Sequence, residues 1–548
     1  MQKKRAFAVF IAVLVLAAAA GDTAGEDRRP ITAEELWKLK RLGSLDLSPD
    51  GMLAAIVVTT YDIEKNEGQG DIWLVDTKEG GARRFTTGET TEGSPAWSPC
   101  GKWIAFTARR EGEKAQLQVI PVGGGEAREL TSMPLGVSDP GWMPDGKHIV
   151  FVSPVIPGWE AKLDSMKAEI ERRAKSKVTA KATENTFYRY WDHWLTDGYV
   201  NHLFMIDVET RQVTPLMPGW DRLTGASGLE YDIAPDGGEI AFTAFRHGEP
   251  YDSLLTDIYL LDPGRPGQVR NLTASNPAND FAPYYTPDGK YILYGAQEIV
   301  GFYGDRVRLV RYDRGTHGKK LLTEGFDRSP AGWTTDARVK TVYFDAEDRA
   351  MGSIFSVGID GGRVREVFRS GFNASVRARP DGRLVFLHQD NAEPTALYSI
   401  RPDGKDLRRL TALNDELLAG IEWGRMEEVW FTGAEGNPVQ MFVMYPPFFS
   451  AEDPGKKWPL LVLVHGGPHG IFGDDFHPRW NTQVFAAPGY VLAMVNFHGS
   501  SSFGQEFADA ITGEHGRKPY DDVMAAVDVL LEKGFIDGKR MAVAGGSY

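Results

Sequence analysis

Short apolar segments recur along the first four hundred residues, and each follows a tight polar turn with a Pro-Asp-Gly core. In such a turn proline presets φ at the second position, aspartate accepts a bond from the backbone, and glycine takes positive φ. Cys100 replaces the aspartate in one copy, and Trp333-Thr334-Thr335-Asp336 is interpreted as a degraded seventh copy. The six clear copies begin at Ser48, Ser98, Met143, Ala234, Thr286 and Arg379.

The segment after each turn is rich in β-branched or aromatic residues and predicts a strand. These strands are expected at residues 53–58, 103–107, 148–152, 239–243, 291–294, 339–344 and 383–388. A second strand with a Leu/Ile-aromatic pattern is expected at residues 72–76, 203–207, 258–262 and 397–400. A third strand ends near Leu-Thr, as at residues 128–131 and 408–411. Each unit is therefore predicted to be a small antiparallel sheet.

The turns are spaced by about 45 to 52 residues, apart from one interval of about twice that length. Sheet repeats of this period are typical of a β-propeller, whose blades bury faces that one blade cannot bury alone. We expect a propeller, with seven blades, over residues 45–414. The long interval holds an insertion near residues 155–202, in which Trp159, Met166 and Ile170 recur at helical spacing. This pattern predicts an amphipathic helix that leaves the third blade.

The insertion ends in a dense aromatic cluster at residues 187–198, which includes Tyr190, Trp191 and Trp194. Two interpretations are open. The aromatic side chains line a substrate cleft, or they pack the inserted helix onto the propeller.

After Thr411 the pattern changes to alternating strands and helices, which favours a mostly parallel sheet in a second domain over residues 415–548. A strand at 459–464 runs into His465-Gly466-Gly467-Pro468. Further strands are expected at 489–496 and 540–544, and a helix at 520–533. The last strand ends in Gly545-Gly546-Ser547-Tyr548, which matches most of a G-x-S-x-G nucleophile elbow. The fold class is therefore a propeller followed by an α/β-hydrolase domain, which we expect to be incomplete.

Ser547 is the candidate nucleophile, and the backbone N–H groups of Tyr548 and Gly467 are the candidate oxyanion donors. In this fold the acid and the histidine base follow the serine, so we expect both beyond Tyr548. His465 is expected to support the glycine loop. The five histidines from His465 to His515 all precede the elbow.

Other chemistry in this region is disfavoured. A zinc site at His465 and His469 requires a helix that the intervening Gly-Gly-Pro opposes. Asp521 and Asp522 are interpreted as caps at a helix start, and residues 500–502 as a polar loop. We expect no metal and no cofactor.

The net charge of −14, without an evident cluster of Lys and Arg, argues against a nucleic-acid partner. Cys100 is the only cysteine, so no internal disulfide can form. Basic residues 3–5 followed by the apolar residues 6–20 predict a signal peptide over residues 1–20, with a mature start near Gly21 and a short helix within residues 21–44. We therefore expect an exported protein, periplasmic or secreted, without a stable membrane anchor after cleavage.

The glycine loop, Asn496-Phe497-His498-Gly499-Ser500, Asp521-Asp522 and the Gly-Gly-Ser-Tyr elbow together resemble the prolyl oligopeptidase family. The long insertion with its aromatic cluster is similar to the acylaminoacyl peptidase and dipeptidyl peptidase V-like branch. One departure is His498, where many relatives have arginine, so a guanidinium role at that position is in doubt.

The resemblance implies a serine exopeptidase that hydrolyses short peptides through an acyl-enzyme, with the propeller excluding folded proteins. Release of N-terminal dipeptides is expected first and removal of an acylated residue second. An esterase or lipase, and a non-catalytic periplasmic propeller that binds protein or peptide, are the alternatives from other classes.

The chain ending at Tyr548 is predicted to be inactive and prone to aggregate, because the triad partners and the later strands are expected beyond it. Measurable peptide hydrolysis by the purified 548-residue chain would contradict this prediction. Sequencing the gene beyond codon 548 tests the premise. A frame that continues to a later Asp and His supports it, and a stop codon favours the binding propeller.

Overall fold

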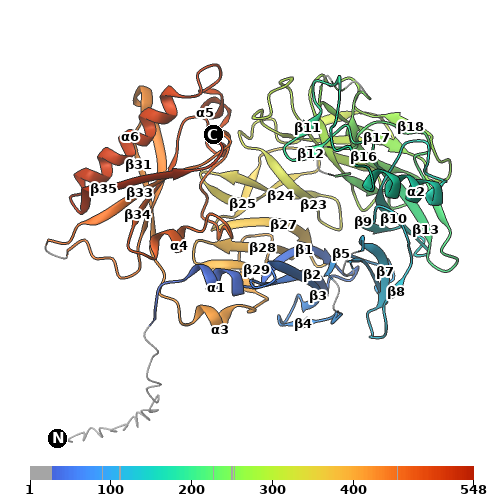
Figure 1. Ribbon diagram of the computed structural model, residues 1–548, viewed down its shortest axis with the longest axis horizontal. Helices are drawn as coiled ribbons and strands as arrows, with labels where there is room; N and C mark the ends of the chain where they lie inside the picture. Colours follow the sequence, from blue (N-terminus) through green and yellow to red (C-terminus); the bar gives the residue numbers. More distant parts are fainter. Residues whose placement is uncertain are drawn as a thin grey trace, which may run out of the picture.

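The computed structural model describes residues 28–548, apart from 89–90, 110–112, 226–227, 249–250, 252 and 453–454. The expected signal peptide and its cleavage site lie outside the described residues. The described chain forms a ring of small antiparallel sheets beside a second, mixed sheet with helices (Figure 1). In the part of the chain that is described, no helix combines the length and the apolar character needed to cross a bilayer.

The first five units of the ring are four-stranded sheets. The first two contain β1 (Arg41–Leu47), β2 (Leu53–Asp62), β3 (Glu67–Asp76) and β4 (Ala82–Arg84), then β5 (Thr91–Trp97), β6 (Trp103–Arg109), β7 (Gln116–Pro121) and β8 (Arg128–Glu129). The third contains β9 (Ser138–Trp142), β10 (His148–Val155), β13 (Val200–Asp207) and β14 (Val213–Pro215). The next two contain β15 (Tyr231–Ile233), β16 (Ile240–Phe245), β17 (Thr256–Leu261) and β18 (Val269–Asn271), then β19 (Asp280–Tyr285), β20 (Tyr291–Ala296), β21 (Arg308–Asp313) and β22 (Lys319–Leu321).

The remaining two units share one sheet, because β25 and β27 form a single parallel pair at Gly352 and Phe372. They contain β23 (Pro330–Thr335), β24 (Thr341–Asp348), β25 (Met351–Gly358) and β26 (Arg365–Phe368), then β27 (Phe372–Ala378), β28 (Leu384–Asp390), β29 (Glu393–Ile400) and β30 (Arg408–Arg409). The strand predicted after each clear turn is present as β2, β6, β10, β16, β20 or β28. The predicted propeller is confirmed.

The degraded turn was predicted at Trp333-Thr334-Thr335-Asp336, and this prediction is wrong because the first three of these residues lie in β23. Asp336 instead opens the turn. Its N–H donates to the Thr341 carbonyl at 3.0 Å, and the Val339 N–H donates to the Asp336 carbonyl at 2.9 Å. Val339 thus occupies the glycine position at φ +52°, a rare conformation for a β-branched residue. The strand then begins at Thr341 rather than at Val339.

Side-chain packing closes the ring where the first unit meets the last. The two units share no strand in the described chain. Backbone and side-chain bonds reinforce the contact: the Gly81 N–H donates to the Leu410 carbonyl at 2.9 Å, and the Arg379 guanidinium donates to the Thr77 carbonyl at 3.0 Å. The apolar contact joins Leu42, Leu45, Ile56 and Val75 to Val385, Leu397 and Leu410.

Bulges in the innermost strands surround the propeller axis. Each of six inner strands has one residue at positive φ, at or next to a shift in pairing register, as in a β-bulge. These residues are Ser44, Ser94, Asp139, Ala282, Gly332 and Ser375. All six line one or both of two axial cavities of about 860 and 530 Å³. The bulges therefore shape the wall of the central channel.

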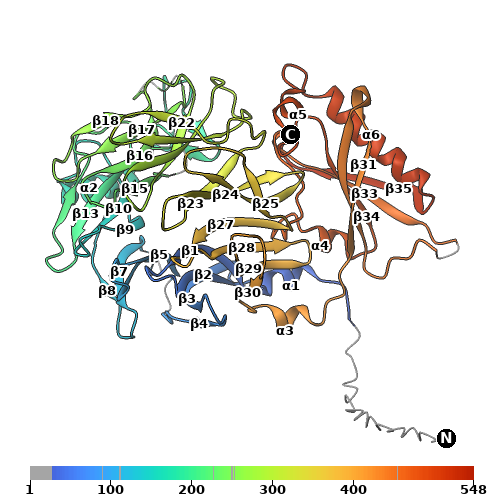
Figure 2. The same ribbon diagram turned by 180° about the vertical axis from the view of Figure 1, so that it is seen from behind.

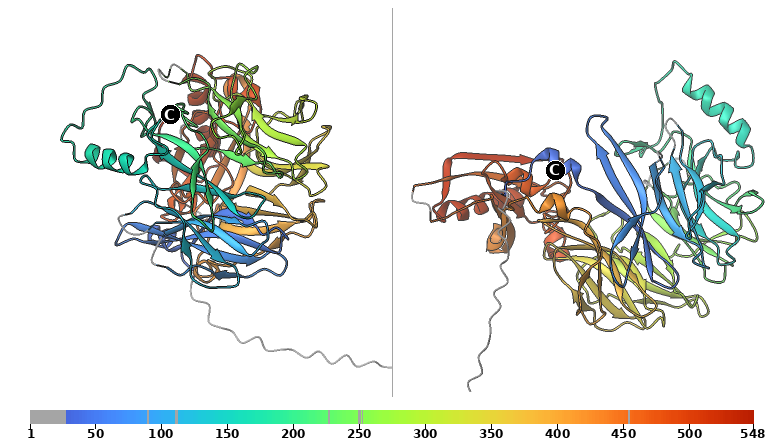
Figure 3. Two further views of the ribbon diagram at one scale, coloured as in Figure 1. Left: turned by 90° about the vertical axis from the view of Figure 1, so that its right-hand side faces the viewer. Right: turned by 90° about the horizontal axis from the view of Figure 1, so that it is seen from below.

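The predicted inserted helix is present as α2 (Leu163–Ala174) and is followed by a hairpin of β11 (Arg189–Tyr190) and β12 (His193–Trp194). Met166 is fully buried against the core of the third unit, and Trp159, Leu163 and Ile170 pack around it. Figure 3 shows α2 on the outside of the propeller, and Figure 1 shows it on the side away from the second sheet.

The second sheet has the order β31-β32-β34-β33-β35. Its strands are β31 (Arg425–Thr432), β32 (Pro438–Tyr445), β33 (Trp458–Val464), β34 (Val491–Asn496) and β35 (Ile536–Gly545). The helices of this part are α3 (Asp415–Leu418), α4 (Thr482–Ala486), α5 (Gln505–Asp509) and α6 (Arg517–Glu532), with a 3₁₀ turn at Ala434–Gly436. β33 pairs in parallel with both β34 and β35, so the carboxyl ends of these strands lie at one edge. The predicted α/β-hydrolase fold is confirmed.

The N-terminal segment lies at the junction between the propeller and the second domain (Figure 2). It forms α1 (Ala33–Lys38), whose start has a capping box between Thr32 and Glu35. The Arg29 N–H donates to the Gly420 carbonyl at 3.1 Å, and the Glu422 N–H donates back to the Arg29 carbonyl at 2.9 Å. The segment therefore fixes the start of the second domain against the propeller.

Candidate active site

Ser547 lies in a sharp turn directly after β35, at φ +67°. Positive φ is unfavourable for serine, so the surrounding structure must hold this conformation. The two residues before Ser547 are glycines, and neither position has room for a side chain. A Cβ added at Gly545 would lie 2.8 Å from the Val464 carbonyl oxygen, and one added at Gly546 would lie 3.2 Å from the Trp480 ring. This is the geometry that a nucleophile elbow requires.

The glycine loop after β33 touches this elbow. A Cβ added at Gly466 would lie 2.8 Å from the Gly546 carbonyl oxygen and 3.1 Å from Ser547 Cβ. Gly467 has φ +129°, and a Cβ there would lie 2.5 Å from the His469 nitrogen. Backbone N–H groups of the loop can approach a carbonyl attacked by Ser547 only because both residues lack side chains.

Tyr548 places its ring 5.8 Å from that of Phe497, and its hydroxyl donates to the His515 carbonyl. Its backbone N–H directly follows the nucleophile, as the predicted oxyanion role requires. The donor roles of Gly467 and Tyr548 stay predictions.

His465 supports the loop through both of its ring nitrogens. Its Nδ1 lies 2.8 Å from the Gly466 carbonyl and must donate, since a carbonyl only accepts. Its Nε2 therefore accepts from the Ser500 hydroxyl at 2.9 Å. The ring stacks on Phe497 with centroids 4.1 Å apart, and burial lowers the pKa of His465 to about 4. A neutral imidazole with both nitrogens engaged is a poor general base.

Other histidines near the site also have fixed partners. His477 Nδ1 accepts from the backbone N–H groups of Arg479 and Trp480, at 3.1 and 2.8 Å. His469 Nδ1 donates to the Gly499 carbonyl at 2.8 Å. Among the hydrogen bonds of the described residues, none joins Ser547 Oγ to a histidine.

Asp522 has a different role from the one predicted. Helix α6 begins at Arg517, so Asp522 lies in its second turn rather than at its start. Its carboxylate is completely buried and accepts from the backbone N–H groups of Ala434 and His498, at 2.7 Å each. The His498 ring lies 2.7 Å from the same carboxylate. The cap interpretation is wrong for Asp522, which instead joins three segments of the domain.

A cavity of about 820 Å³ opens in front of Ser547. Glu347 and Phe372 line both this cavity and a second one of about 520 Å³. Trp333 lines the second and the larger axial cavity, and Arg377 lines both axial cavities. Neighbouring cavities thus share wall residues in a series from the propeller axis to Ser547.

Two carboxyl groups on the wall of the Ser547 cavity were not found from the sequence. Glu347 lies on β24 of the propeller, where burial raises its pKa and the Ser501 hydroxyl donates to it at 2.8 Å. Asp475 belongs to the second domain, and burial, with the negative charges of Asp474 and Glu347, raises its pKa to about 7. No motif marks either residue, because a strand position and a loop position meet only in the folded chain.

The three aromatic residues proposed from the sequence, Tyr190, Trp191 and Trp194, are not among the residues that line the Ser547 cavity. Tyr190 lines the larger axial cavity. Trp191 is 77% exposed at the tip of the β11–β12 hairpin. The Trp194 ring lies 5.6 Å from that of Tyr188 and 4.5 Å from the Lys181 ammonium. Of the three, only Tyr190 is found among the residues that line the cavities described above, and the substrate-binding roles of all three stay predictions.

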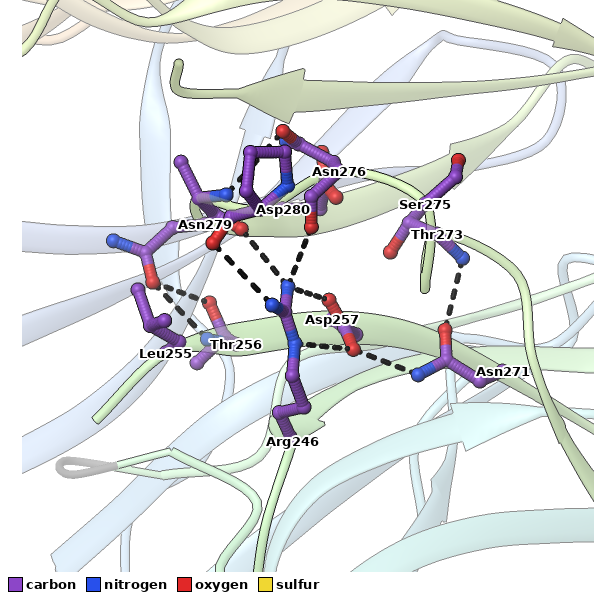
Figure 4. Close-up of polar contacts among 12 residues, drawn as sticks. Arg246, Leu255, Thr256, Asp257, Asn271, Thr273, Ser275, Asn276, Asn279 and Asp280 are labelled. Carbon is purple, nitrogen blue, oxygen red and sulfur yellow. Dashed lines mark hydrogen bonds and ion pairs between the residues drawn. The ribbon is translucent and has the colours of Figure 1, made fainter. Parts of the chain in front are cut away.

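A network around Arg246 fixes the wall of the channel (Figure 4). Its guanidinium makes two bonds to Asp257, at 3.0 and 2.6 Å, and donates to the carbonyls of Asn276 and Ala278 at 2.7 and 3.2 Å. The Asn276 amide donates to Asp280 at 3.0 Å, and burial raises the pKa of Asp280 to about 7. The loop that precedes β19 is thereby held in place beside the channel.

One grouping of the described residues has metal-ligand character. Single ligand atoms of His388, Asp390 and Glu393 lie within 4.8 Å of one another. However, Arg409 Nε donates to Glu393 at 2.7 Å, and its charge compensates that carboxylate. His388 Nδ1 bonds Asn373 at 2.8 Å. These contacts account for the grouping as a polar network, and we assign no metal to it.

A family model described as the prolyl oligopeptidase family matches residues 476–548, and one described as the TolB beta propeller domain matches residues 42–184. The chain is similar to dipeptidyl-peptidase 5 of Porphyromonas gingivalis, at 28% identity over 100% of this chain and 79% of that protein. It is 30% identical to the uncharacterized peptidase YuxL of Bacillus subtilis, over 95% of this chain and 79% of that protein. The fold is similar to the Pyrococcus horikoshii acylaminoacyl peptidase, with a TM-score of 0.75 at 19% identity, covering 95% and 75% of the two chains.

Substitution of Gly466 by alanine is expected to lower kcat of the full-length gene product about a hundredfold, because the new methyl group displaces the elbow. Steady-state hydrolysis of a chromogenic substrate measures the effect. Gly516→Ala is the matched control, since a Cβ there meets no atom within 4 Å. Unchanged kcat in Gly466→Ala would show that the contact does not position Ser547.

Proposed function

The chain belongs to the prolyl oligopeptidase family of serine peptidases, and we propose that it releases dipeptides from the free N-terminus of short peptides. Ser547 attacks the carbonyl of the second residue, and the glycine loop and the Tyr548 N–H stabilise the oxyanion. A histidine base accepts the serine proton and gives it to the leaving amine. Water then hydrolyses the acyl-enzyme and frees the dipeptide.

The carboxyl pair in the Ser547 cavity is the observation that carries this proposal. A free N-terminus brings an ammonium group, which needs a carboxylate partner when it leaves water. Glu347 and Asp475 line the same cavity as Ser547 and repel each other when both are ionised. An ammonium between them removes the repulsion. An acylated N-terminus is uncharged and would leave both groups without a counter-ion.

The series of cavities supports a preference for short peptides. The Ser547 cavity, of about 820 Å³, has room for a few residues and is walled by both domains. A folded protein cannot enter a space of this kind, whereas an unfolded peptide can. The similarity to a dipeptidyl-peptidase 5 agrees with this substrate class. We also propose that the protein is exported, so that it meets peptides outside the cytoplasm.

Glu347→Gln is expected to lower kcat/KM for dipeptidyl amides at least about tenfold, because the charge is lost while the Ser501 bond can persist. Hydrolysis of dipeptidyl and N-acetyl-aminoacyl anilides by the full-length gene product measures the change. Activity on the uncharged N-acetyl substrates should not fall. Glu79→Gln is the matched control, because Glu79 is an exposed propeller carboxylate paired with Lys78 at 3.3 Å, away from the Ser547 cavity.

The same assay separates the alternatives. Wild-type preference for the N-acetyl substrate contradicts dipeptide release and favours an acylaminoacyl peptidase. Hydrolysis of simple esters without peptide amides favours an esterase. No turnover of any substrate favours a binding propeller.

The KM for dipeptidyl amides is expected to rise as the pH falls below about 7. Asp475 has a raised pKa of about 7, so it loses its charge at lower pH, while a peptide amine stays protonated. The rise approaches about tenfold per pH unit, as for one coupled proton. KM measured from about pH 8 to about pH 5.5 tests this expectation. Asp475→Asn should flatten the profile in that window, and an unchanged profile in this variant would contradict the assignment.

A further inference from the structure

A loop of the fifth propeller unit, residues 297–306, reaches the glycine loop of the second domain. Its own side chains hold its shape. The Asp305 carboxylate accepts from the Ile299 N–H at 2.8 Å, and the Gln297 amide donates to the Asp305 carbonyl at 2.8 Å. A loop with these internal bonds can act as a rigid support rather than a loose connection.

The loop holds the ring of His469 between two aromatic side chains. The Phe302 and Tyr303 ring centroids each lie 5.3 Å from the His469 ring, with interplanar angles of 86° and 68°. Edge-to-face contacts of this kind are favourable and directional. Two propeller residues thus define the position of one histidine in the other domain.

Gly304 makes this contact tight. A Cβ added at Gly304 would lie 2.8 Å from His469 Cδ2 and 3.0 Å from Nε2. The φ of Gly304 is not positive, so its backbone conformation does not require glycine. The lack of space for a side chain explains the glycine at this position. The propeller backbone therefore lies directly against the imidazole.

His469 lies two residues after Gly467, and the backbone of the glycine loop turns tightly between them. A Cβ added at Gly467 would lie 2.5 Å from the His469 nitrogen. His469 Nδ1 donates to the Gly499 carbonyl at 2.8 Å, which fixes the other side of the ring. A shift of His469 must therefore move Gly467, whose N–H is the candidate oxyanion donor.

A second tether joins the same propeller loop to the second domain. Gln505, the first residue of α5, accepts from the Arg306 N–H at 2.6 Å and donates to the Gly304 carbonyl at 3.2 Å. The Gln505 N–H also donates to the Asp327 carboxylate at 3.1 Å. The propeller loop is thus bound to α5 on one side and to His469 on the other.

We propose that the loop at residues 297–306 positions the oxyanion hole through His469, so that the propeller is part of the catalytic apparatus. This inference rests on the proposed peptidase function. Phe302, Tyr303 and Gly304 are positioning residues, since none of them lines the Ser547 cavity. They act on the transition state, where the oxyanion forms, and leave ground-state binding in the carboxyl-lined cavity unchanged.

The experiment compares Gly304→Val and Tyr303→Ala with wild type in the full-length gene product. Gly304→Val pushes His469 away, whereas Tyr303→Ala removes one ring from a side chain that is 65% exposed, so the fold should tolerate it. Both variants are expected to lose about ten- to a hundredfold in kcat with KM unchanged. The affinity for a peptide boronate, whose serine adduct carries the oxyanion, should fall by the same factor.

Two matched variants serve as controls. Tyr303→Phe keeps the ring contact and should restore wild-type kcat. Ile63→Ala changes an exposed propeller residue outside this loop, 58% exposed, and should have no effect. Titration of Ser547 with a fluorophosphonate counts active sites, so that kcat refers to folded enzyme.

Unchanged kcat and boronate affinity in both test variants overturn the proposal, as does a loss fully explained by fewer active sites. A parallel loss of kcat and boronate affinity per active site, restored in Tyr303→Phe, supports it. A wild-type preference for N-acetyl substrates overturns dipeptide release alone, because the boronate still reports on the oxyanion hole. A wild-type protein without turnover or boronate binding overturns both.

Discussion

Val464 and Gly545 lie opposite each other in parallel strands, and this register brings together the two loops that carry the chemistry. One strand ends in the glycine loop and its neighbour ends in the nucleophile turn, so both chains leave the sheet at the same edge. The contact between Gly466 and the Gly546 carbonyl follows from this register and leaves no room for a side chain at Gly466. Ser547 then takes positive φ beside the glycine loop, which contains the candidate oxyanion donor Gly467. A register shift of one residue would separate the loops and reverse the faces of β35.

The propeller completes the site from the opposite side. Glu347, on a propeller strand, receives a bond from Ser501 of the second domain, and the Ala350 N–H donates to Ser502 Oγ at 2.6 Å. The aromatic pair at Phe302 and Tyr303 meets the glycine loop. The wall of the cavity is therefore assembled from residues far apart in sequence. A catalytic domain without its propeller would keep the elbow but lose a carboxylate and the outer support of the loop.

The sequence predicts best those features that local chemistry determines. Pro-Asp-Gly turns and β-branched segments identify the propeller strands, and helical spacing of Met166 and Ile170 identifies α2. Val339 was misplaced because nothing in its own chemistry indicates positive φ, and tertiary packing overrides its preference. The role of Asp522 was predicted wrongly because the helix was expected to begin at Tyr520. It begins at Arg517, so Asp522 lies in its second turn and not at its start. Glu347 and Asp475 were missed because their meeting depends on how two domains pack, which no local pattern contains.

The closure of the ring by packing has a mechanical consequence. The polypeptide itself crosses every seam between successive units, whereas no strand of the described residues is shared across the seam between the first and last units. Separation there breaks the contact of Leu42 and Leu45 with Val385 and a few hydrogen bonds, and it leaves every strand pair inside the units intact. This seam is held by side-chain packing and hydrogen bonds alone, so we expect local opening of the ring to begin there. Opening of the ring along this seam would admit an extended peptide from the side, without an end of the peptide having to pass along the axis.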